Sequence, residues 1–386
     1  MQIYVVKAGD TIDEIALRQD VPVESIIYNN QLEYPYALVV GQALLLPGSA
    51  DTGQQDTVRE NPKRLVEVNG YAYPFIRTEI LEQTLPYLTE VSVFSYGFTE
   101  EGELIEPEIS DALLLETAIN FQTAPILTLT PFGADGQFNN YLIHRIVTDP
   151  VAQNHLIENL LNTVRQKQFE GVDIDFEYIL AEDRIAFAEF VANVRNAMSP
   201  EGYSTSVALA PKISDDQPGL LYGGKDYALL GEAADKVLLM TYEWGYTYGP
   251  PMAVAPIHKV EEVVQYALTR IPAEKINMGI PNYGYDWPLP YERGVTKART
   301  LGNVEAVRLA IDKQAEIMFD QTAMSPYFHY EENGILHEVW FEDVRSLQAK
   351  FGLVLNYRLR GMGYWQIMSL FRANWLLLSD TFWIAK

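Results

Sequence analysis

Residues 171–178, Gly-Val-Asp-Ile-Asp-Phe-Glu-Tyr, alternate apolar and acidic side chains with a period of two. Successive side chains of a strand point to opposite faces. The alternation therefore predicts a strand whose apolar residues, from Val172 to Tyr178, pack on one side. Its other side carries three carboxyl groups, those of Asp173, Asp175 and Glu177.

Seven further apolar or β-branched runs predict strands at 66–73, 91–96, 126–130, 204–210, 236–242, 276–283 and 361–367. Helical patterns separate several of them, for example at 154–166 and 183–198, where apolar residues form one stripe. Eight strands that alternate with helices predict an α/β protein with a (β/α)8 TIM barrel. The interval of about 291–360 is too long for one connection and predicts a small α+β insertion before the last strand.

In such a barrel the acidic face of the 171–178 strand lines the interior, where burying an unpaired charge is costly. A purely structural interpretation requires several Arg or Lys side chains aimed at this face, and the chain is poor in basic residues. Neighbouring carboxyl groups then share protons, which raises at least one pKa. Glu177 lies nearest the C-terminal mouth, so we expect it to be a general acid.

The composition excludes several other functions. Among 386 residues the net charge is −24, which disfavours nucleic acid and anionic membranes as partners. Cysteine is absent, and the five histidines form neither HxH nor HExxH. We therefore expect no metal and no cofactor, and we find no run of about 18 apolar residues that could span a membrane.

The first 47 residues form a separate pattern. Residues 3–6 predict a strand, Thr11 and Glu14 have the spacing of a helix-capping box, and Pro22 is placed to open a second helix. Residues 42–47 predict a second strand. The polar stretch 48–64 has the composition of a linker, so we expect the domains 1–47 and 65–386.

This βααβ pattern, with GDTIDEIA, Asn29-Asn30 and the LLLP ending, resembles a LysM module. LysM modules bind N-acetylglucosamine-containing glycans such as peptidoglycan and chitin. The resemblance implies that sugar lies near the loop Tyr36–Val39 and near four residues of the first turn: Gly9, Asp10, Thr11 and Ile12.

The segment FEGVDIDFEY resembles the DGxDxDxE signature of glycoside hydrolase family 18. Met240-Thr241-Tyr242-Glu243-Trp244 resembles the family's sixth-strand motif, and Trp365 resembles its eighth-strand tryptophan. The likeness covers about residues 65–386. It implies a retaining hydrolase in which the substrate's own 2-acetamido oxygen attacks the anomeric carbon.

The resemblance implies a role for each matched residue. Glu177 protonates the leaving oxygen and later activates water, Asp175 holds the acetamido N–H, and Asp173 tunes Asp175. Tyr242 hydrogen-bonds the acetamido carbonyl, and Trp365 forms a floor under the sugar. Further substrate-binding candidates are Met240, Glu243, Tyr71, Tyr283 and Trp340, and the last three could equally be core aromatics.

Departures from the chitinase pattern bear on the substrate. The signature begins with Glu170 instead of Asp, Glu243 replaces the Asp common in chitinases, and Tyr285 stands where many have Arg. With a LysM module and no secretion signal at the N-terminus, the chain resembles the spore-associated branch, which acts on cortex peptidoglycan. We therefore expect a protein made in the cytoplasm and associated with the spore.

Three interpretations remain open. The first is a peptidoglycan N-acetylglucosaminidase, the second is a chitinase or other endo-acting hydrolase of N-acetylglucosamine polymers, and the third is a silent glycan-binding protein. The presence of Glu177 argues against the third.

Overall fold

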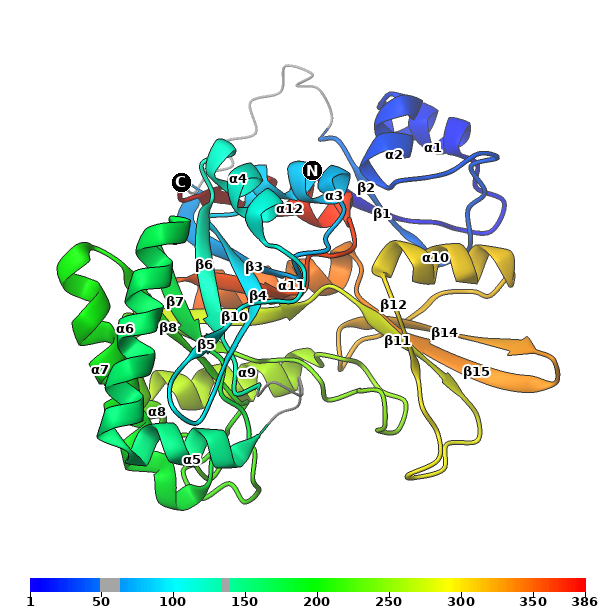
Figure 1. Cartoon of the computed structure of the whole chain (residues 1–386). Helices are drawn as coiled ribbons and strands as arrows, with labels where there is room; N and C mark the ends of the chain where they lie inside the picture. The colour runs from blue at the N-terminus through cyan, green and yellow to red at the C-terminus, as the bar shows by residue number, and fades with distance from the viewer. Residues whose placement is uncertain (49–62, 133–138) are drawn as a thin grey trace.

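The computed structural model describes residues 1–48, 63–132 and 139–386. Its centre is a closed barrel of eight parallel strands in the order β3-β16-β10-β9-β8-β7-β6-β4, with β4 pairing back to β3 (Figure 1). The predicted (β/α)8 barrel is confirmed. The strands are β3 (Arg64–Ala72), β4 (Glu90–Phe98), β6 (Ala124–Leu129), β7 (Gly171–Ile174), β8 (Ser204–Leu209), β9 (Lys236–Leu239), β10 (Ile276–Pro281) and β16 (Gly361–Trp365).

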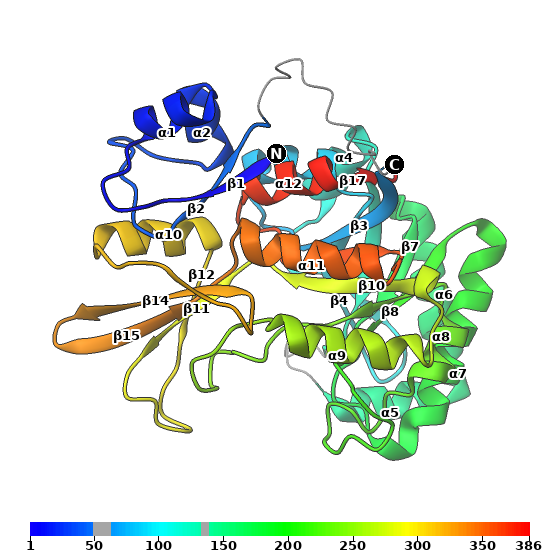
Figure 2. The ribbon, with the colours of Figure 1, turned by 180° about the vertical axis from the view of Figure 1, so that it is seen from behind.

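Helices surround the barrel, as Figures 1 and 2 show from opposite sides. They are α3 (Thr78–Thr84), α4 (Ala112–Asn120), α5 (Asn140–Thr148), α6 (Pro150–Lys167), α7 (Arg184–Met198), α8 (Tyr227–Ala233), α9 (Ile257–Leu268), α11 (Val344–Asn356) and α12 (Arg372–Thr381). Two short strands extend the sheet: β17 (Phe382–Ile384) pairs with β3, and β5 (Leu104–Ile105) pairs with β4.

The acidic strand is shorter than its alternation predicts. Regular pairing ends at Ile174, although the backbone N–H of Asp175 still donates to the carbonyl of Leu129 at 2.9 Å. Phe176 packs outward against the aromatic rings of Phe187 and Phe190 on α7, as expected. Tyr178 does not follow it: its φ of 55° turns the chain, and its side chain lies on the cavity described below. A strand cannot contain this left-handed residue, so the alternation stops at Glu177.

The insertion is a five-stranded antiparallel sheet with one helix, α10 (Asn303–Asp312). It begins earlier than the predicted 291, because β11 follows directly after the seventh barrel strand. The sheet strands are β11 (Gly284–Pro288), β12 (Arg299–Leu301), β13 (Met318–Asp320), β14 (Ser325–Glu332) and β15 (Ile335–Trp340). The predicted interval also included α11, which is a barrel helix.

The N-terminal module has the predicted βααβ order: β1 (Gln2–Val5), α1 (Ile12–Gln19), α2 (Val23–Asn29) and β2 (Ala43–Leu46). Thr11 caps α1 by accepting from the backbone N–H of Glu14 at 3.3 Å. Its own core is small, with Ile15, Ile26 and Leu44 fully buried.

The module is docked on the second domain. Val39 packs into the core of the insertion, and the backbone N–H of Ile317 donates to the carbonyl of Val40 at 2.9 Å. Arg372 donates to the carbonyl of Tyr28 at 2.8 Å. Figures 1 and 2 show α10 between the module and the insertion sheet. Most of the predicted linker (residues 49–62) lies outside the described residues, but these contacts fix the module's orientation without it.

Two glycines of the module allow a matched test of this docking. Gly9 and Gly41 share a φ of 84°, where a side chain costs about 1–2 kcal/mol. A Cβ on Gly9 would meet nothing within 4 Å, whereas one on Gly41 would lie 1.7 Å from the carbonyl oxygen of Ile317. We expect Gly41→Ala to lower the unfolding midpoint clearly more than Gly9→Ala and to expose the module to limited proteolysis. Equal effects of the two substitutions would show that the docking does not hold in solution.

Candidate active site

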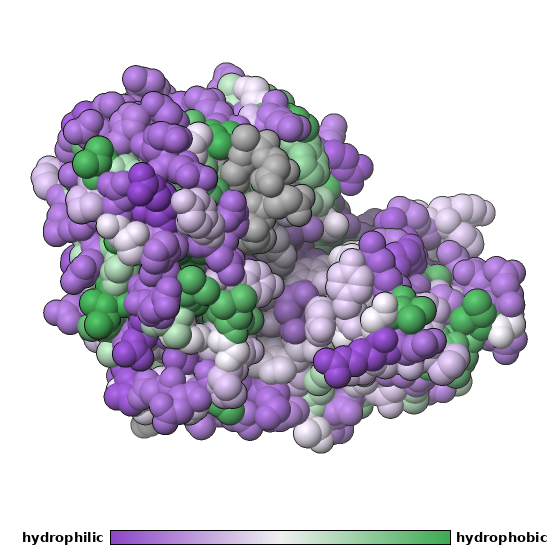
Figure 3. Space-filling view, turned by 60° about the horizontal axis from the view of Figure 1, so that its bottom comes forward, coloured by the Kyte–Doolittle hydropathy of each residue, from purple (hydrophilic) through white to green (hydrophobic). Residues whose placement is uncertain are grey.

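A cavity of about 680 Å³ opens at the C-terminal ends of the barrel strands. Figure 3, in which this face comes forward, shows a hollow between the barrel and the insertion. The lining residues are mainly aromatic and acidic: Tyr71, Tyr73, Phe94, Phe132, Asp175, Glu177, Tyr178, Ala208, Pro211, Leu221, Tyr222, Leu238, Met240, Tyr242, Glu243, Trp244, Tyr246 and Trp365. Because all eight strands point their carboxyl ends at one face, residues far apart in sequence meet there.

Asp173 lies at the base of this cavity and is almost fully buried. Its carboxylate accepts hydrogen bonds from the hydroxyl of Ser206 at 2.6 Å and the hydroxyl of Tyr71 at 2.8 Å. Burial raises the pKa of Asp173, and these two donors oppose the rise. Both carboxylate oxygens of Asp173 thus accept a hydrogen bond. The donors Ser206 and Tyr71 lie on β8 and β3, so Asp173 is held in place by two other strands of the barrel.

Asp175 and Glu177 lie above Asp173 and line the cavity. Burial, followed by the charge of Glu177, raises the pKa of Asp175 well above its usual range. One oxygen of Asp175, Oδ1, has no hydrogen-bond partner among the described residues. Burial also raises the pKa of Glu177, and no arginine or lysine in the described chain forms an ion pair with it. Asp175 and Glu177 are therefore placed to hold a proton in an enclosed site that is connected to the cavity mouth.

Aromatic side chains form one wall of the cavity. Trp365 packs edge-on against Phe94, with ring centroids 4.8 Å apart, and lies 5.7 Å from the ring of Tyr71. Tyr242 projects from the end of β9, and its neighbour Met240 also lines the cavity. Such a surface suits the apolar faces of a sugar ring.

Glu243 is held by tyrosines in place of an arginine. The Tyr285 hydroxyl donates to its Oε1 at 2.9 Å, and the Tyr283 hydroxyl donates to the same oxygen. Burial raises the pKa of Glu243, although these two donors oppose the rise. Glu243 and Tyr285, the two residues that depart from the chitinase pattern, therefore contact each other. The side chain of Glu243 is longer than that of the usual Asp and reaches the hydroxyl of Tyr285.

Two predicted residues are not brought to the cavity surface. Tyr283 lies behind Glu243, and Trp340 lies on β15, stacked on Tyr327 with centroids 4.5 Å apart. Its indole N–H donates to Glu338 at 2.7 Å, so Trp340 belongs to the insertion sheet. The core alternative holds for both residues.

In the module, Asp10 is already engaged within its own turn. Its carboxylate accepts from the hydroxyl of Tyr4 at 2.7 Å and the backbone N–H of Lys7 at 2.8 Å, and it pairs with Arg18. The hydrogen bond from Arg18 is the largest of the contributions that lower its pKa to about 2. Ile12 is buried in the module's core, whereas Gly9 and Thr11 are exposed.

The sequence interpretation missed several lining residues and a lysine. Phe94 lies in the middle of β4, and Tyr73, Tyr222 and Tyr246 lie in loops; no motif marks any of the four. Lys225 is fully buried, and its charge acts on Asp173, Asp175 and Glu177. Although the chain is poor in basic residues, one lysine therefore does approach the acidic face.

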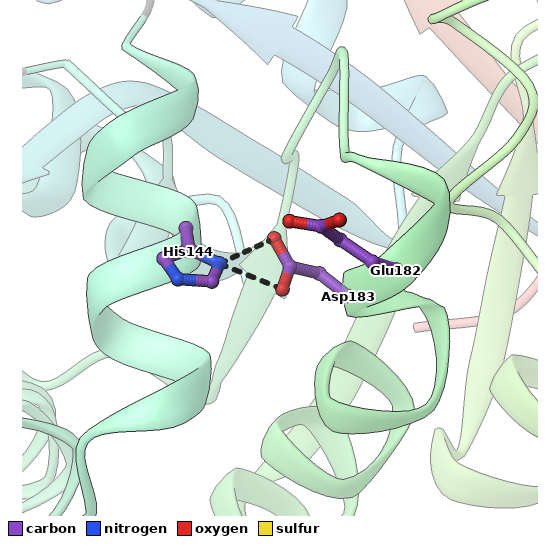
Figure 4. Close-up of side chains that lie close together, drawn as sticks. All are labelled: His144, Glu182 and Asp183. Carbon is purple, nitrogen blue, oxygen red and sulfur yellow. Dashed lines mark hydrogen bonds and ion pairs between the residues drawn. The ribbon is translucent and has the colours of Figure 1, made fainter.

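A second group of polar side chains lies outside the cavity. Figure 4 shows His144 on α5 facing Asp183, with Glu182 beside it, and the ligand atoms of the three lie within 4.8 Å of one another. His144 Nδ1 lies 2.8 Å from Asp183 Oδ1, so the contact is a histidine–carboxylate pair that ties α5 to the chain following Glu177. The expectation of no metal stays a prediction. None of the helices in the described ranges combines the length and apolarity needed to cross a bilayer.

Comparisons with known proteins agree with this geometry. The model of the glycosyl hydrolases family 18 matches residues 126–369, and that of the LysM domain matches residues 4–47. A cortical fragment-lytic enzyme of Bacillus subtilis is 36% identical and is matched over 100% of this chain and 99% of its own. The crystal structure of the Bacillus cereus spore cortex-lytic enzyme SleL has a TM-score of 0.93 at 34% identity, covering 100% of this chain and 98% of that one. A chitinase from Chromobacterium violaceum has a TM-score of 0.75 at 25% identity, covering 82% and 98%.

Proposed function

The chain belongs to the glycosyl hydrolases of family 18 and carries a LysM domain, and on this premise we propose that it cleaves spore cortex peptidoglycan after N-acetylglucosamine. The observation that carries the proposal is the stacked carboxyl side chains at the barrel mouth beside an aromatic wall. Similarity over the whole chain to cortical fragment-lytic enzymes supports the choice of glycan.

The proposed mechanism is substrate-assisted and retaining. Glu177, whose pKa is raised by burial, gives its proton to the leaving glycosidic oxygen. The substrate's acetamido oxygen attacks the anomeric carbon and forms an oxazolinium ion. Glu177, now a carboxylate, then takes a proton from a water molecule as that water attacks the anomeric carbon and opens the ring of the ion. No protein carboxylate is needed as the nucleophile.

The neighbouring residues would orient and stabilise the reacting acetamido group. Oδ1 of Asp175, which has no partner in the part of the chain that the structure describes, would accept the acetamido N–H, and the negative charge of Asp175 stabilises the cation. Asp173 supports Asp175 from below, Tyr242 faces the acetamido carbonyl, and Trp365 supports the ring. Met240, Glu243 and Tyr71 complete the pocket, while Tyr283 acts by holding Glu243.

The experiment is a direct product analysis. The protein is incubated with soluble cortex fragments and, separately, with chitin oligomers, and the new reducing-end sugars are identified. We expect cortex fragments to be cut with N-acetylglucosamine at the new reducing end. Cleavage of chitin alone would replace the proposal by a chitinase, and binding without cleavage of either would indicate a glycan-binding protein.

The module is proposed to contribute glycan affinity through its exposed turn and the loop that contains Tyr36. Deleting residues 1–50 is a poor test, because Val39 and Leu45 pack into the second domain's cores and their loss would unfold more than the module. We therefore propose residues 1–47 and 65–386 as two parts with separate functions. Structurally, the two parts are packed against each other.

A point substitution separates binding from stability. The Tyr36 ring is 39% exposed, and Leu17 on α1 is 84% exposed and serves as the control. We expect Tyr36→Ala to weaken binding to insoluble cortex sacculi about two- to tenfold, as for the loss of one aromatic contact. Turnover of soluble fragments should be unchanged, and Leu17→Ala should alter neither. Equal loss on soluble and insoluble glycan would refute a separate role for the module.

The remaining expectations follow from the same proposal. A spore cortex hydrolase acts in the spore, so we propose spore association for this chain, as the names of its relatives suggest. The net charge of −24 keeps nucleic acid an unfavourable partner.

A further inference from the structure

Lys225 is the one lysine in the described chain whose charge acts on all three carboxyl groups of the site, Asp173, Asp175 and Glu177. It is 0% exposed, although lysine is among the residues least often fully buried. Its Nζ donates to the carbonyl oxygen of Ala208 at 2.8 Å, and Ala208 itself lines the cavity. The ammonium group therefore ends directly behind the cavity wall.

The loop that carries Lys225 is packed against the chain that carries the acid. A Cβ on Gly224 would lie 2.5 Å from the carbonyl oxygen of Ile179, two residues after Glu177. On the other side, Lys212 Nζ donates to the carbonyl of Lys225 at 2.9 Å. The backbone of Lys225 is thus fixed between the end of β7 and the end of β8, and its side chain has little freedom to leave.

We propose that Lys225 is a positioning residue of the hydrolase: its buried ammonium group limits the Asp175–Glu177 pair to one shared proton at neutral pH. Among the described residues, neither Asp175 nor Glu177 forms a direct ion pair. The Lys225 ammonium group therefore supplies the compensating positive charge from behind the cavity wall. Without it, two carboxyl groups in an enclosed site would both be protonated, and Asp175 could not stabilise a cation. The proposal deepens the proposed function and rests on it.

The charge balance of the site supports this role. Burial raises the pKa of both Asp175 and Glu177, and in each the charge of Lys225 opposes the rise. Burial lowers the pKa of Lys225, while Asp175 exerts the largest opposing effect, ahead of Glu177 and Asp173. The other titratable groups that interact electrostatically with these carboxyls are Tyr71, Tyr73, Tyr178, Tyr242, Glu243 and Lys236.

The test compares two variants at Lys225 with a matched control. Lys225→Met removes the charge and the donor, whereas Lys225→Gln removes the charge and keeps an N–H for Ala208. Lys275→Met is the control, since Lys275 is partly buried and donates to two backbone carbonyls, while the carboxyl groups that its charge acts on lie outside the cavity. The measurement is kcat/KM on soluble cortex fragments from pH 4 to 9.

Removing a positive charge raises the carboxyl pKa values, so both limbs of the pH profile should move to higher pH. We expect a shift of about one pH unit or more for both Lys225 variants and none for Lys275→Met. Three outcomes would make Lys225 a structural residue and overturn the proposal. They are an activity that falls equally at every pH, a pH profile that Lys225→Gln restores to that of the parent, and failure of both variants to fold. A parent protein that cleaves no glycan would instead overturn the proposed function.

Discussion

Glu177→Gln is expected to lower kcat on soluble cortex fragments by about 10²–10⁴-fold while leaving glycan binding nearly unchanged. Gln has the shape of the protonated acid, but it cannot give a proton to the leaving oxygen. The side chain forms no ion pair in the described residues, so its replacement by the isosteric Gln breaks none. The measurement is single-turnover cleavage, with binding followed separately by co-sedimentation with sacculi.

The control for this prediction is Glu182→Gln. Glu182 lies five residues further along the chain and is exposed, so its change tests the loss of a nearby carboxylate without touching the cavity. It should retain the parent's rate. If Glu177→Gln also retained that rate, the proton would come from another group, and the proposed mechanism would be wrong.

The fold could be predicted from the sequence because its signals are local. Alternation in residues 171–178 and seven apolar or β-branched runs placed all eight barrel strands, since such runs can be recognised without knowledge of distant contacts. The same alternation failed at Tyr178, where a left-handed backbone residue ends it. Nothing in the residue type announces such a turn, because tyrosine is disfavoured there.

The site could be predicted only where a motif carries it. Asp173, Asp175, Glu177 and Tyr242 lie on strand ends, so their meeting follows from the barrel itself. Lys225 lies in a long loop between β8 and α8, and its approach depends on how that loop packs against Ile179. Trp340 shows the converse: an aromatic residue in a sequence segment without a motif was assigned to the site, and it packs on Tyr327.

The docking of the module on the second domain could not be predicted from the sequence either. Residues 48–64 have the composition of a flexible tether, and on that pattern a tethered module was expected. The contacts that oppose free movement join residues more than 250 positions apart, such as Val40 with Ile317 and Tyr28 with Arg372. These contacts therefore hold the module and the barrel in a fixed relative orientation.

Asp175→Asn is expected to lower kcat by about a hundredfold or more and to stabilise the fold at neutral pH. Asn cannot supply the negative charge that stabilises the oxazolinium ion, and its amide can present the wrong atom to the acetamido N–H. The fold gains because a buried carboxyl group with an unpartnered oxygen is replaced by a neutral one.

The stability gain should grow with pH. Because the pKa of Asp175 is raised in the folded protein, the folded state keeps a proton that the unfolded state loses above the ordinary value of 3.8. The parent's stability therefore falls as pH rises from that value through the raised pKa, and the variant lacks this loss. The unfolding midpoints of the two proteins should separate progressively between pH 4 and pH 7.

A second buried aspartate provides the opposite case. Asp286 accepts from the hydroxyl of Tyr330 at 2.8 Å and contacts His337 at 2.8 Å, so Asp286→Asn should destabilise the insertion. A site kept for catalysis differs from a structural one in that a carboxyl oxygen, such as Oδ1 of Asp175, has no partner among the described residues, at a cost in stability. If Asp175→Asn lowered the midpoint as Asp286→Asn does, Asp175 would be a structural acid, and its assignment to the acetamido group would fail.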